Sequence, residues 1–170
     1  MNNFKGYAGI HLVVALGFLL LFPAFLPAQT AAELEALLDS PVVSCSEAAR
    51  YVAASVGGEA SMGGDLSMEG EAGIIPPEAA FEWAMGRGWL PRKAAPDDPI
   101  KMGDLSFLLM KAFDLKGGLM YIIFPGPRYA FRAMVSRSFI QGTADPDMKP
   151  NGERFLQILG NVLDAAGGES

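Results

Sequence analysis

The chain has 170 residues, of which 51% are hydrophobic and 19% are charged, and its formal net charge is −6. This length and composition fit one globular domain, or a few small repeats that share a core. The basic residues are scattered and form no cluster of the kind that neutralises phosphates, so we do not expect nucleic acid as a partner.

The first residues have the layout of a secretory signal peptide, which we place at 1–28. Lys5 precedes an uninterrupted apolar run over 12–22, and the helix-breaking Pro23 follows it. The apolar core of a signal peptide is typically about 7–15 residues, whereas a membrane span needs about 20. We therefore expect a protein exported to the periplasm or cell envelope of a bacterium. The alternative is an uncleaved anchor over 8–28, and only in that case do we expect contact with a membrane.

Histidine and cysteine are almost absent. The one histidine, His11, lies in the signal peptide, and the one cysteine is Cys45. The exported part would then have no imidazole, which removes Ser/His/Asp and Cys/His nucleophilic pairs and most zinc sites. It would also have no internal disulfide, so packing alone must hold the fold together. We expect a protein that is not an enzyme and that uses no metal and no cofactor.

Two capping boxes predict two short helices after the signal peptide. In such a box, a hydroxyl at the N-cap and a carboxylate three residues later satisfy each other's backbone donors. The boxes begin at Thr30 and Ser44 and predict helices over roughly 31–39 and 45–56. Cys45 would fall in a first helical turn, where the dipole lowers the pKa of a thiol, but we interpret it as a small, semi-buried side chain.

The predicted architecture is all-α, with helical hairpins stacked in tandem copies of about fifty residues. An N-terminal part over 29–56 and a flexible loop over 57–76, rich in Gly, Ser, Met and Glu, precede two full copies over 77–118 and 127–168. The helix over 45–56 resembles the second half of a truncated third copy. Residues identical between the full copies are Pro77/Pro127, Ala80/Ala130, Phe81/Phe131, Arg87/Arg137, Ala94/Ala144, Pro96/Pro146, Asp97/Asp147, Leu109/Leu159, Asp114/Asp164, Gly117/Gly167 and Gly118/Gly168.

Each full copy has the same layout. A proline opens a first helix, a loop with Pro-Asp follows, and a second helix has apolar residues at i, i+3, i+4, i+7 and i+8. Between the copies, 119–126 is a short apolar run, which we interpret as a buried extended crossing, although periodicity does not decide between helix and strand. The expected core residues are Ala80, Phe81, Ala84, Leu105, Leu108, Leu109, Ala112 and Phe113, and then Ala130, Phe131, Met134, Phe155, Ile158, Leu159, Val162 and Leu163.

This order of helix, Pro-Asp loop and helix resembles the S-layer homology domain. The matching stretches are "AAFEWAMGRGWLPRKAAPDDPIKMGDLSFLLMKAF" and "YAFRAMVSRSFIQGTADPDMKPNGERFLQILGNVL", with "SCSEAARYVAASV" as the remnant of a first unit. They cover about half of the chain when only the two full copies are counted. The resemblance implies a helical fold of three units that attaches an exported protein non-covalently to cell-wall polymer.

The resemblance also implies where the polymer would bind. The family uses a Thr-Arg-Ala-Glu-like segment at the start of the second helix, and this chain has "SCSE", "KMGD" and "NGER" there, with no arginine at the family's place. Arg154, two positions beyond that place, is the best candidate for an anionic contact, and Trp83 is a candidate for stacking on a sugar. The full set of candidate ligand-binding residues is Glu47, Lys101, Asp104, Asn151, Glu153, Arg154 and Trp83.

Two pairs of charged residues recur together between the copies, and we interpret them as structural. Arg87 with Asp97, and Arg137 with Asp147, would each pin a loop to a helix end through a bidentate ion pair. The acidic stretch over 145–153 does not have the spacing of a calcium-binding EF-hand loop, so we predict no metal site there.

Three functions remain open at this point. The first is non-covalent binding of cell-wall polymer by a module that is not catalytic. The second is an interaction or structural module that binds another envelope protein and has no affinity for glycans. The third, less favoured, is a hydrolase that uses two carboxylates, for which Asp97, Asp98 and the acids of 145–153 would be the source.

Overall fold

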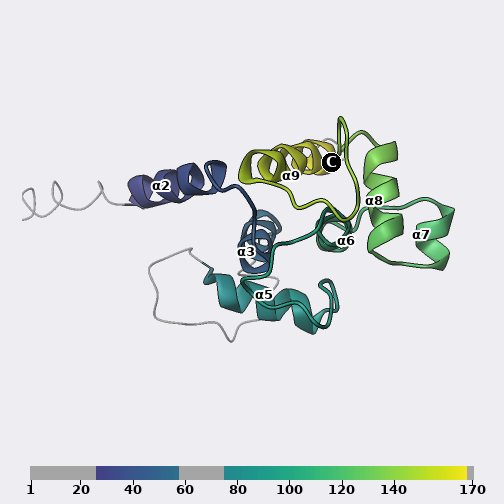
Figure 1. Cartoon of the computed structure of the whole chain (residues 1–170), viewed down its shortest axis with the longest axis horizontal. Coiled ribbons are helices and arrows are strands. Elements are labelled where there is room, and N and C mark those ends of the chain that lie inside the picture. Colours follow the sequence, from purple (N-terminus) through teal and green to yellow (C-terminus); the bar gives the residue numbers. More distant parts are fainter. Residues whose placement is uncertain (1–25, 58–74, 168–170) are drawn as a thin grey trace, which may run out of the picture. The chain divides into compact units, whose positions relative to one another are not determined.

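The computed structural model describes residues 26–57 and 75–167, and these residues are mainly helical (Figure 1). The described ranges contain no strand; a single isolated bridge joins Ser44 to Pro99. The helices are α2 (Leu26–Leu38), α3 (Cys45–Ser55), α5 (Pro77–Gly86), α6 (Met102–Ala112), α7 (Leu119–Ile123), α8 (Pro127–Ser136) and α9 (Gly152–Gly167). The mainly all-α class predicted from the periodicity is confirmed.

Two of the predicted segments fall largely outside the described residues. They are the signal peptide over 1–28 and the loop over 57–76. Where the structure does describe the chain, no helix is both long enough and apolar enough to cross a membrane.

Helix α2 differs from its prediction. It begins at Leu26, so Thr30 lies inside the helix and is not its N-cap, and the predicted start at residue 31 is wrong. The helix up to Leu37 belongs to one of two units of the chain, and the second unit begins at Leu38, the last residue of the helix. The second unit is called the helical body below.

Neighbouring helices of the helical body pack in pairs. α3 packs along α5 and α6 packs along α8, while smaller contacts join α3 to α6 and to α9. Figure 1 shows α3 and α6 in the middle of this body, with α5 below them, α9 above them and α8 to the right. The close pair α6 and α8 therefore crosses the boundary between 77–118 and 127–168, because it joins the last helix of one segment to the first helix of the next.

The segments that precede α3, α6 and α9 meet inside the helical body through backbone hydrogen bonds. The Val43 N–H donates to the Pro150 carbonyl at 3.1 Å, and the Ile100 N–H donates to the Val43 carbonyl at 3.0 Å. The Gly152 N–H donates to the Ser40 carbonyl at 3.0 Å. Val43, Ile100 and Pro150 are buried. These bonds hold the starts of three helices close together.

The Pro-Asp loops accept hydrogen bonds from the first turns of α3 and α6. The first N–H groups of a helix have no partner inside it and need an outside acceptor. The acceptors here are carbonyls of the two loops, in the bonds Cys45 to Asp98 (2.9 Å), Ser46 to Pro96 (3.0 Å), Met102 to Met148 (2.8 Å) and Gly103 to Pro146 (2.8 Å). Each loop is thereby fixed to a helix from an earlier part of the chain.

The core agrees closely with the apolar periodicity. Most of the residues expected inside are buried: Ala80, Phe81, Ala84, Leu105, Leu108, Leu109, Ala130, Phe131, Met134, Phe155, Ile158, Leu159 and Val162. The exceptions lie near the last turns of α6 and α9, where Ala112 and Phe113 are half-buried and Leu163 is exposed. The helix ends extend beyond the packed interior.

The segment between α6 and α8 is neither extended nor buried. It contains α7, a short helix of which only Tyr121 is buried, and α7 packs on α8. The predicted buried crossing over 119–126 is therefore wrong. The physical reason is that α6 and α8 pack directly on each other, which leaves no room in the core for the segment that connects them.

Candidate functional site

A polar groove lies where α6 and α8 begin. It has a volume of about 390 Å³ and is open to solvent. Its walls come from the start of α6, the start of α8 and the loop before α9. The lining residues are Lys101, Gly103, Asp104, Pro127, Arg128, Asp145, Pro146 and Asp147. Two of the predicted ligand-binding residues, Lys101 and Asp104, are thus brought together in one cavity.

An ion pair crosses this α6–α8 groove. The Lys101 ammonium lies 2.8 Å from Oδ1 of Asp147, and both side chains are exposed to solvent. Asp147 is therefore paired with the residue that precedes α6, and the predicted pair between Arg137 and Asp147 is wrong. The reason is that the start of α6 and the loop of Asp147 are bonded through their backbones, which places Lys101 beside the carboxylate.

The charges of the groove influence one another. The hydrogen bond and the charge of Lys101 hold the pKa of Asp147 below its ordinary value, and Arg128 acts in the same direction. The pKa of Asp104 is raised because the carboxyl is partly desolvated, with Asp147 adding to the rise and Lys101 opposing it. Two cations and three carboxylates therefore face one cavity, a mixed set that can donate to and accept from many hydroxyl groups.

Arg128 is the groove residue that the sequence did not single out. It follows Pro127, the first residue of α8, and it is exposed. In the register of the two predicted copies Arg128 stands where the first has Glu78, so identity between them could not reveal it. Its place directly after Pro127, which recurs as Pro77 at the start of a helix, was the available signal.

Glu47 and Asn151 cap helices. The Ser44 N–H donates to Oε2 of Glu47 at 2.9 Å, and the Glu47 N–H donates to Oγ of Ser44 at 3.2 Å, so the predicted capping box is confirmed. Oδ1 of Asn151 accepts from the Arg154 N–H at 3.0 Å at the start of α9. Both side chains therefore act locally on the helix that follows them.

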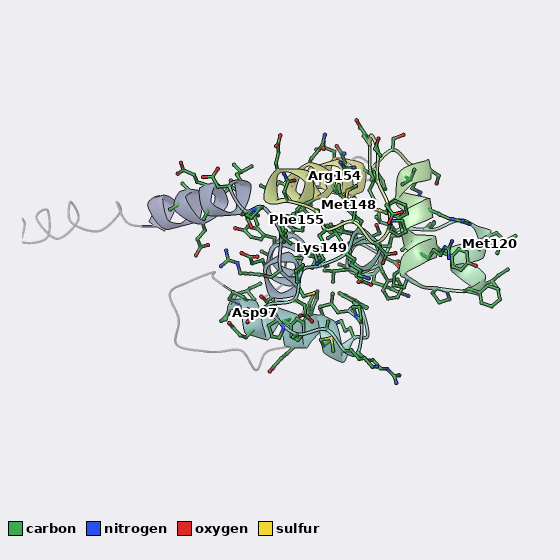
Figure 2. All side chains as sticks on the ribbon, in the orientation of Figure 1. Asp97, Met120, Met148, Lys149, Arg154 and Phe155 are labelled. Atoms are coloured by element: carbon green, nitrogen blue, oxygen red, sulfur yellow. The ribbon has the colours of Figure 1, made fainter. Side chains whose placement is uncertain are left out.

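Arg154 of α9 forms hydrogen bonds with the loop that precedes this helix. Its Nη2 donates to the carbonyls of Gln141 and Thr143, at 3.0 Å each. Figure 2 shows Arg154 and Phe155 next to each other on α9, while Asp97 lies on the opposite side of the helical body near α5. Glu153 is exposed beside Arg154. Arg154 and Glu153 do not line the α6–α8 groove.

Trp83 is enclosed by its neighbours. Its side chain is 9% exposed, its ring meets Trp89 edge to face with centroids 4.8 Å apart, and the Arg87 guanidinium lies 4.9 Å from the ring centroid. A sugar needs an open aromatic face, so the prediction that Trp83 stacks on a sugar is wrong. The sequence favoured Trp83 because Ala133 stands at its place in the second copy, and both residues are buried.

Arg87 lies over aromatic rings, and its pair with Asp97 stays a prediction. Arg87 also lies over Trp89, 5.5 Å from the ring centroid. The guanidinium lies close to both indole rings, an arrangement that suits a weakly hydrated cation.

Cys45 is buried at the start of α3 and is 4% exposed. Burial raises the pKa of its thiol to about 11, and the charges of Asp104 and Asp98 contribute to the rise. This direction is opposite to the one expected from the helix dipole alone, because desolvation of the thiolate outweighs the dipole. The thiol is thus a small packing group.

The described residues contain no group of three or more histidine, cysteine, aspartate or glutamate side chains that could hold a metal ion. Comparisons with protein-family models, with curated proteins and with solved structures find no match to this chain.

Proposed function

We propose that this chain is an exported, non-catalytic protein of the bacterial cell envelope that binds cell-wall polymer non-covalently through the α6–α8 groove. In this proposal the chain consists of a signal peptide followed by helical copies in tandem, as in a degenerate S-layer homology module. The observation that carries it is the groove itself, where Lys101 and Asp104 of one copy face Arg128 and Asp147 of the next.

The arrangement of the helix starts supports this proposal. Equivalent N–H groups at the starts of α3 and α6 donate to equivalent carbonyls of the two Pro-Asp loops, as tandem copies would require. The segment before α9 is bonded to the segment before α3, because the Pro150 carbonyl accepts a hydrogen bond from the Val43 N–H. A surface made by successive copies is the usual binding surface of a repeat protein.

The chemistry of the groove suits a hydroxylated and partly anionic polymer. Carboxylates at Asp104, Asp145 and Asp147 accept hydrogen bonds from sugar hydroxyls, and Arg128 offers a bidentate donor to an acidic substituent. Because the cavity is open and its charged groups other than the half-buried Asp104 are exposed, a chain of sugars could pass through it without being enclosed. This geometry favours equilibrium binding over a hydrolase, which would need a cleft that surrounds the scissile bond.

The test is co-sedimentation of the full chain with isolated bacterial cell walls, with a wall-free sample to correct for self-association. We expect saturable binding that weakens about tenfold in Arg128→Ala, the effect of losing one hydrogen bond to a charged group. Arg92→Ala is the matched control, since Arg92 is exposed in the loop after α5 and lies outside the groove.

Two results would contradict wall binding. One is the absence of saturable sedimentation at any salt concentration, and the other is equal binding by Arg128→Ala and Arg92→Ala. Either result, with an unchanged circular dichroism spectrum, leaves the second candidate, an interaction with another envelope protein, which pull-down with the same variants would then test.

A further inference from the structure

An exposed apolar surface surrounds α7. Five consecutive or nearly consecutive large side chains, between 52% and 72% exposed, form what we call the α7 surface: Leu119, Met120, Ile122, Ile123 and Phe124. Large exposed apolar side chains elsewhere in the described residues are less exposed than any of these five. Single exposed apolar residues are normal on a protein, whereas a contiguous group indicates a surface that something else covers.

The α7 surface is held in place by one buried residue. Tyr121 is 8% exposed, and its ring meets Phe107 of α6 edge to face with centroids 6.3 Å apart. A Cβ atom at Gly117 would collide with the Tyr121 ring, so the ring packs directly on the backbone there. With this side chain fixed inward, the other large side chains of the helix face outward. Figure 2 shows Met120 at the outer edge of the helical body, beyond α8.

Cations lie beside the α7 surface. The Lys111 ammonium is 6.0 Å from the centroid of the Tyr121 ring, and Arg132 lines a hollow of about 250 Å³ together with Leu119 and Tyr121. Lys116 is exposed two residues before Gly118, the N-cap of α7. Asp114 is the acid whose charge acts on Tyr121. An excess of positive charge thus borders the apolar residues, although the whole chain has a net charge of −6.

The α7 surface, which is apolar and has cations at its border, is complementary to an anionic lipid surface. Apolar side chains enter the boundary between headgroups and acyl chains, while lysine and arginine beside them contact lipid phosphates. A second copy of the chain fits less well, because two-fold packing of the apolar residues would bring the positively charged borders of both copies close together. A stable protein interface also buries about 800 Å² on each partner, more than one short helix offers.

We propose that the α7 surface inserts into the interfacial layer of a membrane that contains anionic lipids. The sequence linked membrane contact only to an uncleaved leader, and this contact is separate from the leader. It does not depend on the proposed binding of wall polymer, since the α7 surface and the α6–α8 groove share no residue.

The test places an environment-sensitive fluorophore on the α7 surface of the full chain. The variant Ile122→Cys is labelled with the nitrobenzoxadiazole fluorophore, while the buried Cys45 remains unreacted, which is checked on the wild-type chain. Vesicles contain phosphatidylcholine alone or phosphatidylcholine with phosphatidylglycerol. We expect a blue shift of the emission, and quenching by spin-labelled lipid, with the anionic vesicles. Because the readout is local, binding of vesicles by the N-terminal apolar run does not imitate it.

Two controls make the result specific. Asp97→Cys carries the same fluorophore on an exposed loop, and it should show no shift. Lys116→Glu with Arg132→Glu, in the Ile122→Cys chain, should need at least about thirtyfold more anionic lipid for a half-maximal shift, since the two lost cations would each have contributed about 1 kcal/mol. Arg92→Glu with Lys93→Glu matches this change of charge away from α7.

Three outcomes would overturn the proposal. The first is no shift at Ile122→Cys while the vesicles retain the protein, and the second is an equal shift at Asp97→Cys. The third is a shift that grows with protein concentration in the absence of lipid, which would assign the α7 surface to self-association.

Discussion

The ammonium of Lys101 and the carboxylate of Asp147 lie 2.8 Å apart and join the residue that precedes α6 to the loop that precedes α9. The two residues are far apart in the chain, and each belongs to a different predicted copy. Because both side chains are largely exposed, water and salt screen their attraction. The pair therefore shapes the groove more than it stabilises the fold.

The pH dependence of this pair gives the first prediction. In Lys101→Met, the pKa of Asp147 should rise toward the ordinary value of 3.8, because the hydrogen bond from Lys101 that lowers this pKa most is removed. The pair's stabilisation is present above pH 3.8 and is lost as the pH falls through the lower pKa of the folded state. The measurement is an NMR titration of the Asp147 carboxyl carbon. Lys93→Met should leave that titration unchanged, and an unchanged titration in Lys101→Met would contradict the pair in solution.

Arg154 should matter for stability and not for binding. Removing its guanidinium in Arg154→Ala leaves the carbonyls of Gln141 and Thr143 without their donor. We expect a loss of about 1–3 kcal/mol in the free energy of unfolding, measured by urea denaturation, because the lost hydrogen bonds come from a charged group. Affinity for cell walls should stay as in the wild type. A large loss of wall binding at unchanged stability would contradict this prediction and indicate that Arg154 contacts the polymer.

Phe155 is the largest fully buried side chain among the residues that the structure describes. Its ring meets Tyr51 of α3 edge to face, with centroids 6.0 Å apart, so it joins α9 to the centre of the fold. Phe155→Ala should lower the free energy of unfolding by about 3–5 kcal/mol, the usual cost of a cavity of this size. Leu163→Ala, at an exposed position on the same helix, should cost far less. Equal losses in the two variants would show that α9 is not packed as described.

Cys45 should be unreactive in the folded protein. Its side chain is buried and the pKa of its thiol is raised to about 11, so almost no thiolate is present at pH 8. Iodoacetamide should react much faster in urea than in buffer. Between pH 9.0, the ordinary pKa of the thiol, and about 11, the unfolded thiol ionises first, so stability should fall with rising pH in the wild type. This part of the fall should be absent in Cys45→Ser.

The core could be predicted from the sequence because it depends on local periodicity. Apolar residues at helical spacing identified the inner faces of α5, α6, α8 and α9, and the structure buries most of them. The capping box of Ser44 and Glu47 was equally local and is present. The local predictions failed at helix ends. Helix α2 starts at Leu26, earlier than the capping box at Thr30 suggested.

The candidate site depended on pairings that periodicity does not contain. Arg137 and Asp147 recur with Arg87 and Asp97, and the recurrence suggested pairs within each copy. The structure instead brings Asp147 to Lys101, because backbone bonds fix the later loop to the earlier helix. For the same reason the sequence found Lys101 and Asp104 but could not associate them with Arg128.

By itself the sequence determined the helical class, the inner face of each helix and the polar character of the helix starts, since these follow from spacing along one segment. Only the tertiary structure decided which charges share the α6–α8 groove, that Trp83 is enclosed and that the segment 119–126 is displayed on the surface. These outcomes depend on which helices pack together, and α6 packs on α8 through contacts between residues distant in the chain.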